Sequence, residues 1–269
     1  MMRTRKKKLL CFLLAAVMMC TAGYALPGLS LNASAAGTPT SLGLSEHGIM
    51  AHRDGWKYQS GGKGETGTGG ARVSDCAGLI YAYFSDLKAV GNCGGGATTQ
   101  VTTNCVFSND LSEGLPRIHG LVLTMPDYYD PGTGIYGHIG IYIGNNEAAD
   151  NSDYEYNMRR EPVLGSSRGW TAWHVFDNGM KYPTNGWYAM DGKMYHYTGY
   201  EYDVNTEVDG YSIGSDGVAL GADGKALPVD GSMLSSEYAS ASKVASHLKA
   251  QGYSGKDSTA DLINGSGGG

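Results

Sequence analysis

The clearest hydrophobic pattern in the chain predicts a helix that begins at Asp75. Apolar residues follow at steps of three and four, which places them on one buried helical face; they are Leu79, Ile80, Tyr83, Phe84 and Leu87. Cys76 falls on the same face, in the first turn. The helix therefore presents a thiol at its N-terminal end, where backbone N–H groups and the helix dipole favour an anion.

A two-residue alternation later in the chain predicts strands. Residues 138–143 alternate apolar isoleucines with His, Gly and Tyr, as in a strand with one apolar face. Residues 120–125 predict another strand, and residues 147–151 a third that returns after the turn residues Asn145 and Asn146. A helix followed by an antiparallel sheet predicts an α+β fold.

The first 35 residues have the features of a secretory signal peptide. A basic start precedes an apolar run from Leu9 to Cys20, and small residues at 33–35 stand at the cleavage spacing. The run is shorter than the roughly 20 residues of a spanning helix, and an uncleaved anchor is the weaker alternative. We therefore expect a secreted or wall-associated protein that begins near Ala36 and is not inserted in a membrane after cleavage.

The charge of the chain disfavours nucleic acid as a partner. The formal net charge is −6, and removal of the leader with its five Lys and Arg residues lowers it to −11. An acidic chain with no cluster of Lys and Arg lacks the surface that neutralises phosphates.

Three cysteines remain after removal of the leader, and an odd number suggests one reactive thiol in an oxidising compartment. Cys93 and Cys105 flank a Gly/Thr-rich loop and could pair, which would leave Cys76 free. Whether that bridge forms stays open at this point.

Three short motifs stand in order within residues 45–182. Residues 58–62 read Tyr-Gln-Ser-Gly-Gly, residues 74–80 read Ser-Asp-Cys-Ala-Gly-Leu-Ile, and residues 137–145 read Gly-His-Ile-Gly-Ile-Tyr-Ile-Gly-Asn. Together they resemble the Tyr-Val-Trp-Gly-Gly, Asp-Cys-Ser-Gly-Leu and Gly-His-Val-Gly-Ile-Tyr motifs of the NlpC/P60 cysteine peptidases. The resemblance implies the papain-like α+β fold of that family.

The resemblance also implies a function and a set of site residues. It implies hydrolysis of peptidoglycan stem peptides at the bond between γ-D-glutamate and the diamino acid, with Cys76 as nucleophile and His138 as base. The family's polar third residue, twelve positions after the base, is Asp150 here, and Tyr58 is carried over beside the nucleophile. Asp75 either holds a substrate amine or caps the helix. No cofactor is implied, and the absence of HExxH and paired CxxC motifs disfavours a metal enzyme.

The face on which Asp150 lies depends on the turn before it. A strict two-residue turn at Asn145 and Asn146 puts Asp150 opposite His138, whereas one more loop residue or a bulge brings both to the same face. Asn151 is the alternative third residue.

Other functions stay open from the sequence. The same fold could serve as an amidase or acyltransferase on another substrate, or the chain could bind the cell wall without catalysis. The intact Cys76, His138 and Asp150 argue against a non-catalytic protein but do not separate a hydrolase from a transferase. We interpret His119 and His174 as packed or exposed structural residues.

The composition changes after Pro183 to aromatic residues and Asp-Gly pairs. Residues 186–197 resemble one unit of the aromatic cell-wall-binding repeats of secreted wall enzymes, with a packed hairpin meander as the alternative. Asp-Gly recurs every seventh residue, at 209, 216, 223 and 230. This spacing favours short strands with tight turns over calcium binding, because the ligand spacing of an EF-hand loop is absent.

The last element expected is a helix over residues 235–251. Ser235 or Ser236 would cap it, Gly252 would stop it, and one face would hold Tyr238, Ala241, Ala245 and Leu248. The predicted organisation is a signal peptide (1–35), a catalytic domain (36–184), a repeat-like β segment (185–232), and a helix with a disordered Gly-rich tail (233–269).

Overall fold

The structure is a computed structural model of the 269-residue chain, and it describes residues 37–89, 93–126 and 136–255. The expected signal peptide and Gly-rich tail lie outside the described residues. Within these ranges the helices are α2 (Ser41–Arg53), α3 (Cys76–Asp86), α4 (Ala97–Asn104), η1 (Leu111–Glu113) and α5 (Ala241–Ala250). No helix in the described ranges has both the length and the apolar character needed to cross a membrane.

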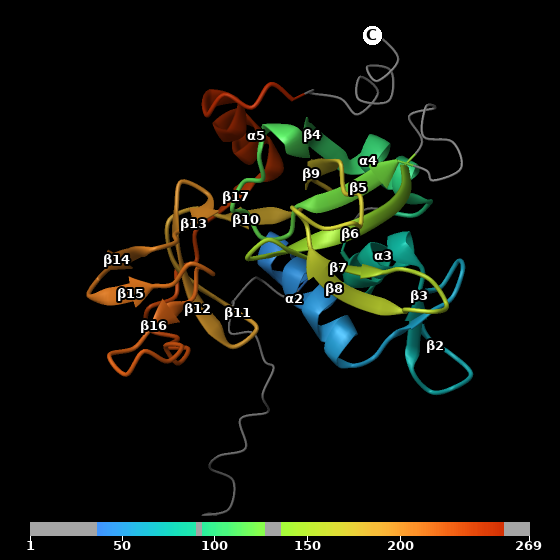
Figure 1. The fold of residues 1–269 in the computed structure, drawn as a ribbon, viewed down its shortest axis with the longest axis horizontal. Helices are drawn as coiled ribbons and strands as arrows, with labels where there is room; N and C mark the ends of the chain where they lie inside the picture. Colours follow the sequence, from blue (N-terminus) through green and yellow to red (C-terminus); the bar gives the residue numbers. More distant parts are fainter. Residues whose placement is uncertain (1–36, 90–92, 127–135, 256–269) are drawn as a thin grey trace, which may run out of the picture.

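A six-stranded antiparallel sheet forms the centre of the fold (Figure 1). Its strands in spatial order are β4 (Cys105–Asp110), β9 (Ala172–Phe176), β5 (Val122–Pro126), β6 (Tyr136–Gly144), β7 (Glu147–Asn151) and β8 (Met158–Pro162). The three strands predicted from the alternation correspond to β5, β6 and β7. Helices α2, α3 and α4 pack against β6, which confirms the α+β prediction.

Strand β6 separates an apolar face from the face that carries His138. Its isoleucines are buried, and Gly48 of α2 lies close to the side chains of Ile141 and Ile143. At the far end of the other face, the Tyr142 hydroxyl is 3.0 Å from that of Tyr202. One face therefore builds the core with α2, and the other is left for His138 at the start of the strand.

Helix α3 has the predicted start and the predicted buried face. Leu79 and Ile80 are fully buried, and burial of such a side chain stabilises a fold by about 1.5–3 kcal/mol. A small sheet of β1 (Lys57–Tyr58), β3 (Arg72–Ser74) and β2 (Lys63–Thr66) leads into the helix. A Cβ at Gly78 would lie 1.8 Å from the carbonyl oxygen of Gly62, so the glycine lets this small sheet contact the first helical turn.

The C-terminal part adds short strands beside the main sheet (Figure 1, orange). They are β10 (Lys181–Pro183), β11 (Gly186–Met190), β12 (Lys193–Thr198), β13 (Glu201–Tyr202), β14 (Thr206–Val208), β15 (Tyr211–Ile213), β16 (Ala219–Leu220) and β17 (Tyr238–Ser240). Asp209 and Gly210 join β14 to β15 with positive φ angles of 53° and 83°, as a tight hairpin turn requires. Asp216, Asp223 and Asp230 each accept a hydrogen bond from the backbone N–H two residues on.

Aromatic residues of β11 and β12 are packed inside the protein. Tyr188 and Tyr197 are fully buried and belong to the same core as α3 and β6. Trp187 is 5% exposed and donates from its indole N–H to Asp209. These rings pack within the antiparallel meander of β11, β12 and β13.

The last helix begins later than the sequence predicts. Residues 238–240 form β17, in which Tyr238 pairs with Pro183 of β10, and α5 starts at Ala241 with Ser240 at its N-cap. The prediction that Tyr238 lies on the helix was wrong because pairing with β10 holds this segment extended. The other predicted face residues, Ala241, Ala245 and Leu248, are buried in α5.

Candidate active site

Cys76 is the first residue of α3 and is partly exposed. Asp75 precedes it as the N-cap: one carboxylate oxygen accepts the N–H of Gly78 at 2.6 Å, and the other accepts the N–H of Gly61 at 2.9 Å. Both Asp75 oxygens are thus engaged with the backbone, which supports the capping interpretation. The thiol lies at a helix N-terminus, where a thiolate is stabilised.

A bulge in the β6–β7 pair brings Asp150 to the face of His138. The turn at Asn145 and Asn146 pairs Gly144 with Glu147, but the register then shifts, and Tyr142 pairs with Ala148. Asp150 is then level with Gly140, two residues from His138, and the two positions share a face. This is the second of the two registers considered from the sequence.

His138 and Asp150 form a buried ion pair. Nε2 of His138 is 2.7 Å from Oδ2 of Asp150, whose side chain is fully buried. Burial disfavours the imidazolium, but the hydrogen bond to Asp150 and the interaction with nearby Cys76 outweigh it and raise the pKa of His138 to about 9. The structure therefore brings Cys76, His138 and Asp150 together, with His138 in direct contact with the carboxylate.

Asn151, the alternative third residue, points elsewhere. Its side-chain amide donates to the Ser74 carbonyl at 3.0 Å, the Ser74 hydroxyl at 2.9 Å and the Lys57 carbonyl at 3.1 Å. Asn151 thus ties β7 to the small sheet that leads into α3. None of these three hydrogen bonds is to His138.

Tyr58 lies near Cys76. Partial burial raises its pKa, and the neighbouring Cys76 and Asp75 add to the rise. Its ring meets that of Tyr154 edge to face, with centroids 4.8 Å apart. Tyr154 is 70% exposed, so this pair forms an aromatic rim beside Cys76.

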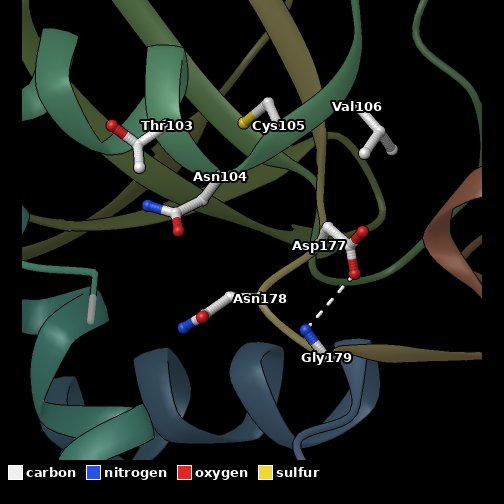
Figure 2. A pocket seen from close by; sticks show the side chains of 7 residues that line it. All are labelled: Thr103, Asn104, Cys105, Val106, Asp177, Asn178 and Gly179. Atoms are coloured by element: carbon white, nitrogen blue, oxygen red, sulfur yellow. Dashed lines mark hydrogen bonds between the residues drawn. The ribbon is translucent and has the colours of Figure 1, made fainter. Parts of the chain in front are cut away.

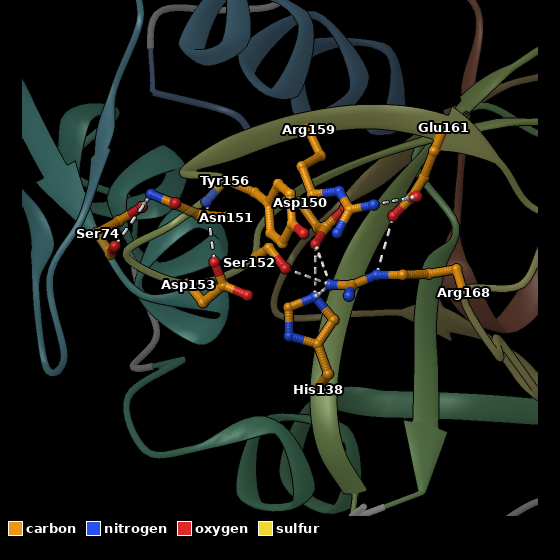
Figure 3. Close-up of polar contacts among 10 residues, drawn as sticks. All are labelled: Ser74, His138, Asp150, Asn151, Ser152, Asp153, Tyr156, Arg159, Glu161 and Arg168. Atoms are coloured by element: carbon orange, nitrogen blue, oxygen red, sulfur yellow. Dashed lines mark hydrogen bonds and ion pairs between the residues drawn. The ribbon is translucent and has the colours of Figure 1, made fainter.

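A charged residue that the sequence did not indicate completes the site (Figure 3). The Arg168 guanidinium is 2.7 Å from Oδ2 of Asp150, 2.9 Å from Nε2 of His138 and 2.9 Å from Glu161. Arg168 lies in the irregular segment between β8 and β9, where the sequence has no helical or strand periodicity that could indicate its position. Trp170, in the same segment, packs its ring 5.5 Å from that of His138.

His119 and His174 are structural. Burial lowers the pKa of each to about 3. His174 is held by the hydroxyls of Thr124 and Ser108, each 2.7 Å away, and His119 stacks on the Tyr202 ring at 4.5 Å. Both are therefore neutral packed residues.

The other two thiols differ chemically from Cys76. Cys93 and Cys105 are unbridged in the structure, so the pairing considered from the sequence is not formed. Burial raises the pKa of Cys93 to about 11 and that of Cys105 well above its usual value. Cys105 lines an open polar pocket of about 370 Å³ with Asp177 and Asn178 (Figure 2), which holds none of the candidate site residues. In the described ranges, no three His, Cys, Asp or Glu side chains cluster as a metal site.

Comparisons with known proteins find similarity to solved structures only. No protein-family model matches the chain, and no curated protein matches it. Solved structures match about half of it. The chain resembles NlpC/P60 proteins in structure.

Three of these NlpC/P60 structures illustrate the extent of the likeness. An NlpC protein from Trichomonas vaginalis is 19% identical over 49% of this chain and 47% of its own length, with a TM-score of 0.35. The P60 domain of an antigen from M. avium subspecies paratuberculosis is 17% identical. The match covers 50% of this chain and 94% of that domain, with a TM-score of 0.34. The peptidoglycan hydrolase RipB from Mycobacterium tuberculosis is 18% identical. The match covers 51% of this chain and 67% of RipB, with a TM-score of 0.33. The match spans about half the length of the Trichomonas protein.

Proposed function

We propose that this chain is a secreted cysteine hydrolase that cleaves peptide stems of peptidoglycan, with Cys76, His138 and Asp150 as its catalytic residues. The observation that carries the proposal is the 2.7 Å contact between the His138 ring and the buried carboxylate of Asp150, with Cys76 close enough to the ring to raise its pKa. A nucleophile, a base and an orienting acceptor in hydrogen-bond contact are the requirement for acyl transfer.

The reaction would proceed through a thioester. The Cys76 thiolate attacks the scissile carbonyl, and the backbone N–H at the start of α3 would stabilise the oxyanion. His138 gives its proton to the leaving amine as the C–N bond breaks. The neutral ring then takes a proton from water, whose hydroxide adds to the thioester, and the acid leaves with the thiol restored. Asp150 holds the ring by its Nε2 side, which leaves Nδ1 for the thiol.

The substrate class is supported by the sequence motifs. Their resemblance to the NlpC/P60 peptidases favours the amide between γ-D-glutamate and the diamino acid, and the predicted leader favours action outside the cell. Peptidoglycan is present there, and the net negative charge of the chain disfavours nucleic acid as a partner. Tyr58 stands beside the nucleophile, where it would orient the thiol or the substrate.

Purified peptidoglycan tests the proposal. Residues 36–269 should release new stem fragments, identified by mass spectrometry of the muropeptides, and the Cys76→Ala variant should release none. Cys93→Ala is the matched control and should cleave like the unmodified protein. Identical digests from the unmodified protein and Cys76→Ala would contradict the hydrolase and favour a wall-binding protein. Products in which an added amine replaces water would identify a transferase.

Selective alkylation tests the activation of Cys76 without any substrate. Iodoacetamide near neutral pH should modify Cys76 first, because the pKa values of the Cys93 and Cys105 thiols are both raised and Cys93 is buried as well. Reaction of Cys76 at the rate of an ordinary free thiol would argue against any catalytic role.

A further inference from the structure

Arg168 contacts two of the proposed catalytic residues, yet the proposed reaction gives it no step. One nitrogen of its guanidinium, Nη2, is 2.7 Å from Oδ2 of Asp150, 2.7 Å from Oγ of Ser152 and 2.9 Å from Nε2 of His138. The side chain is only 16% exposed, so solvent screens these contacts weakly. A surface ion pair would not converge in this way on one carboxylate oxygen and one ring nitrogen.

The guanidinium is held from its other side by β8. Nε of Arg168 is 2.9 Å from Oε1 of Glu161, and Oε2 of Glu161 is 3.0 Å from the guanidinium of Arg159. Figure 3 shows these groups extending from His138 to Glu161 in one continuous set of contacts. Arg168 thus links the proposed catalytic pair on β6 and β7 to an acidic anchor on the edge strand.

We propose that Arg168 is a positioning residue, which fixes the Asp150 carboxylate against His138 and whose charge limits how firmly the ring keeps its proton. The expected loss of kcat in Arg168 variants rests on the proposed function. The positioning of the Asp150 carboxylate by Arg168 rests only on the contacts of Arg168 with Asp150, His138 and Glu161. Arg168 need not touch the substrate in this role.

The contacts of Nε2 explain both effects. When Nε2 carries a proton, it donates to Asp150; when it does not, it can accept from Arg168. The guanidinium therefore favours the deprotonated ring by direct contact and by repulsion of the imidazolium. The charged or titratable groups that face His138 from the elements around it are Cys76 of α3, Asp150 of β7 and Arg168, with Glu161 of β8 behind Arg168.

The NMR titration of His138 in the full mature chain is the test, since it needs no substrate. The side-chain nitrogen signals of the unmodified protein should be followed from pH 5 to 10.5, with a His138→Gln variant for assignment. The buried rings of His47, His119 and His174 will not interfere, because burial holds their pKa values at about 4, 3 and 3. In Arg168→Gln the His138 midpoint should move upward by about one pH unit or more, because a neighbouring like charge is removed.

Two further variants separate charge from positioning. Arg168→Lys keeps a positive charge but cannot hold Asp150 and Glu161 at once, so its titration should stay near that of the unmodified protein while kcat falls by about tenfold or more. Arg160→Gln removes a neighbouring arginine of β8 that pairs with Glu147 at 2.6 Å instead. This matched control should leave both the titration and kcat unchanged.

The proposal fails if Arg168→Gln titrates like Arg160→Gln, or if Arg168→Lys keeps the full kcat. Should Arg168→Gln not fold, Arg168→Lys still decides, since a role limited to structure predicts no loss of kcat in a folded lysine variant. Failure of the proposed function has a different signature. In that case the unmodified protein would not cleave peptidoglycan, while the upward shift of His138 in Arg168→Gln would persist.

Discussion

Asp150→Asn replaces the buried carboxylate beside His138 with a neutral amide of nearly the same size. In the folded protein the pKa of His138 is about 9, against about 6.5 for an unperturbed histidine. The difference of about 2.5 units corresponds to about 3 kcal/mol of stabilisation of the folded state. Because the folded pKa is the higher one, this contribution is fully present below pH 6.5 and is lost as the pH rises through 9.

The variant should reduce this pH dependence. Asp150 and Cys76 share the stabilisation of the imidazolium, so Asp150→Asn should diminish the fall in stability between pH 6.5 and 9 by about 1 kcal/mol or more. The same change removes the acceptor that sets the tautomer of the ring, so kcat/KM on peptidoglycan should fall by about 100-fold or more. Urea unfolding at four pH values across this window, followed by circular dichroism, measures the first effect.

Asp203→Asn is the matched control, because Asp203 also lies 2.7 Å from a histidine, His196, in the C-terminal segment. It should leave cleavage unchanged. An equal pH dependence of unfolding in Asp150→Asn and in the unmodified protein would refute the reasoning. So would an Asp150→Asn variant that cleaves at the original rate.

Two glycines give further predictions from close contacts. Gly78→Ala should lower the free energy of unfolding by about 3 kcal/mol, since its Cβ would lie 1.8 Å from the Gly62 backbone; Gly69→Ala, with open space around it, should change little in the same urea titration. Gly140→Ala places a Cβ 2.6 Å from the Trp170 ring, so stability should fall by about 1–3 kcal/mol and peptidoglycan cleavage by about tenfold or more. Normal cleavage by a folded Gly140→Ala variant would show that the packing behind His138 is not needed.

The elements with regular apolar patterns could be predicted from the sequence. The three- and four-residue steps after Asp75 gave α3 and its cap, and the alternation from His138 gave β6. The bulge between β6 and β7 could only be considered as one of two registers, because the turn residues Asn145 and Asn146 permit both. Packing between the strands decides it, and with it the position of Asp150.

The missed elements have local sequences that oppose their structure. Helix α2 contains Gly43 and Gly48, which weaken helices, but a Cβ at Gly48 would lie 3.0 Å from that of Ala149, so the contact requires glycine. Helix α4 is rich in β-branched threonine, and Gln100 anchors it by a 2.8 Å bond to the Ala77 carbonyl. Arg168 lies in an irregular segment, and its partners His138 and Asp150 are 30 and 18 residues away in the sequence.

The most direct measurement of the central claim is the mass of the protein during turnover. The unmodified protein should be mixed with soluble muropeptide, quenched in acid within milliseconds to seconds, and digested for peptide mapping. The account predicts a stem-peptide acyl group on the peptide that contains Cys76, absent in Cys76→Ala and accumulating more slowly in His138→Gln. Cleavage of muropeptide by Cys76→Ala, or an acyl group carried by another residue, would contradict it.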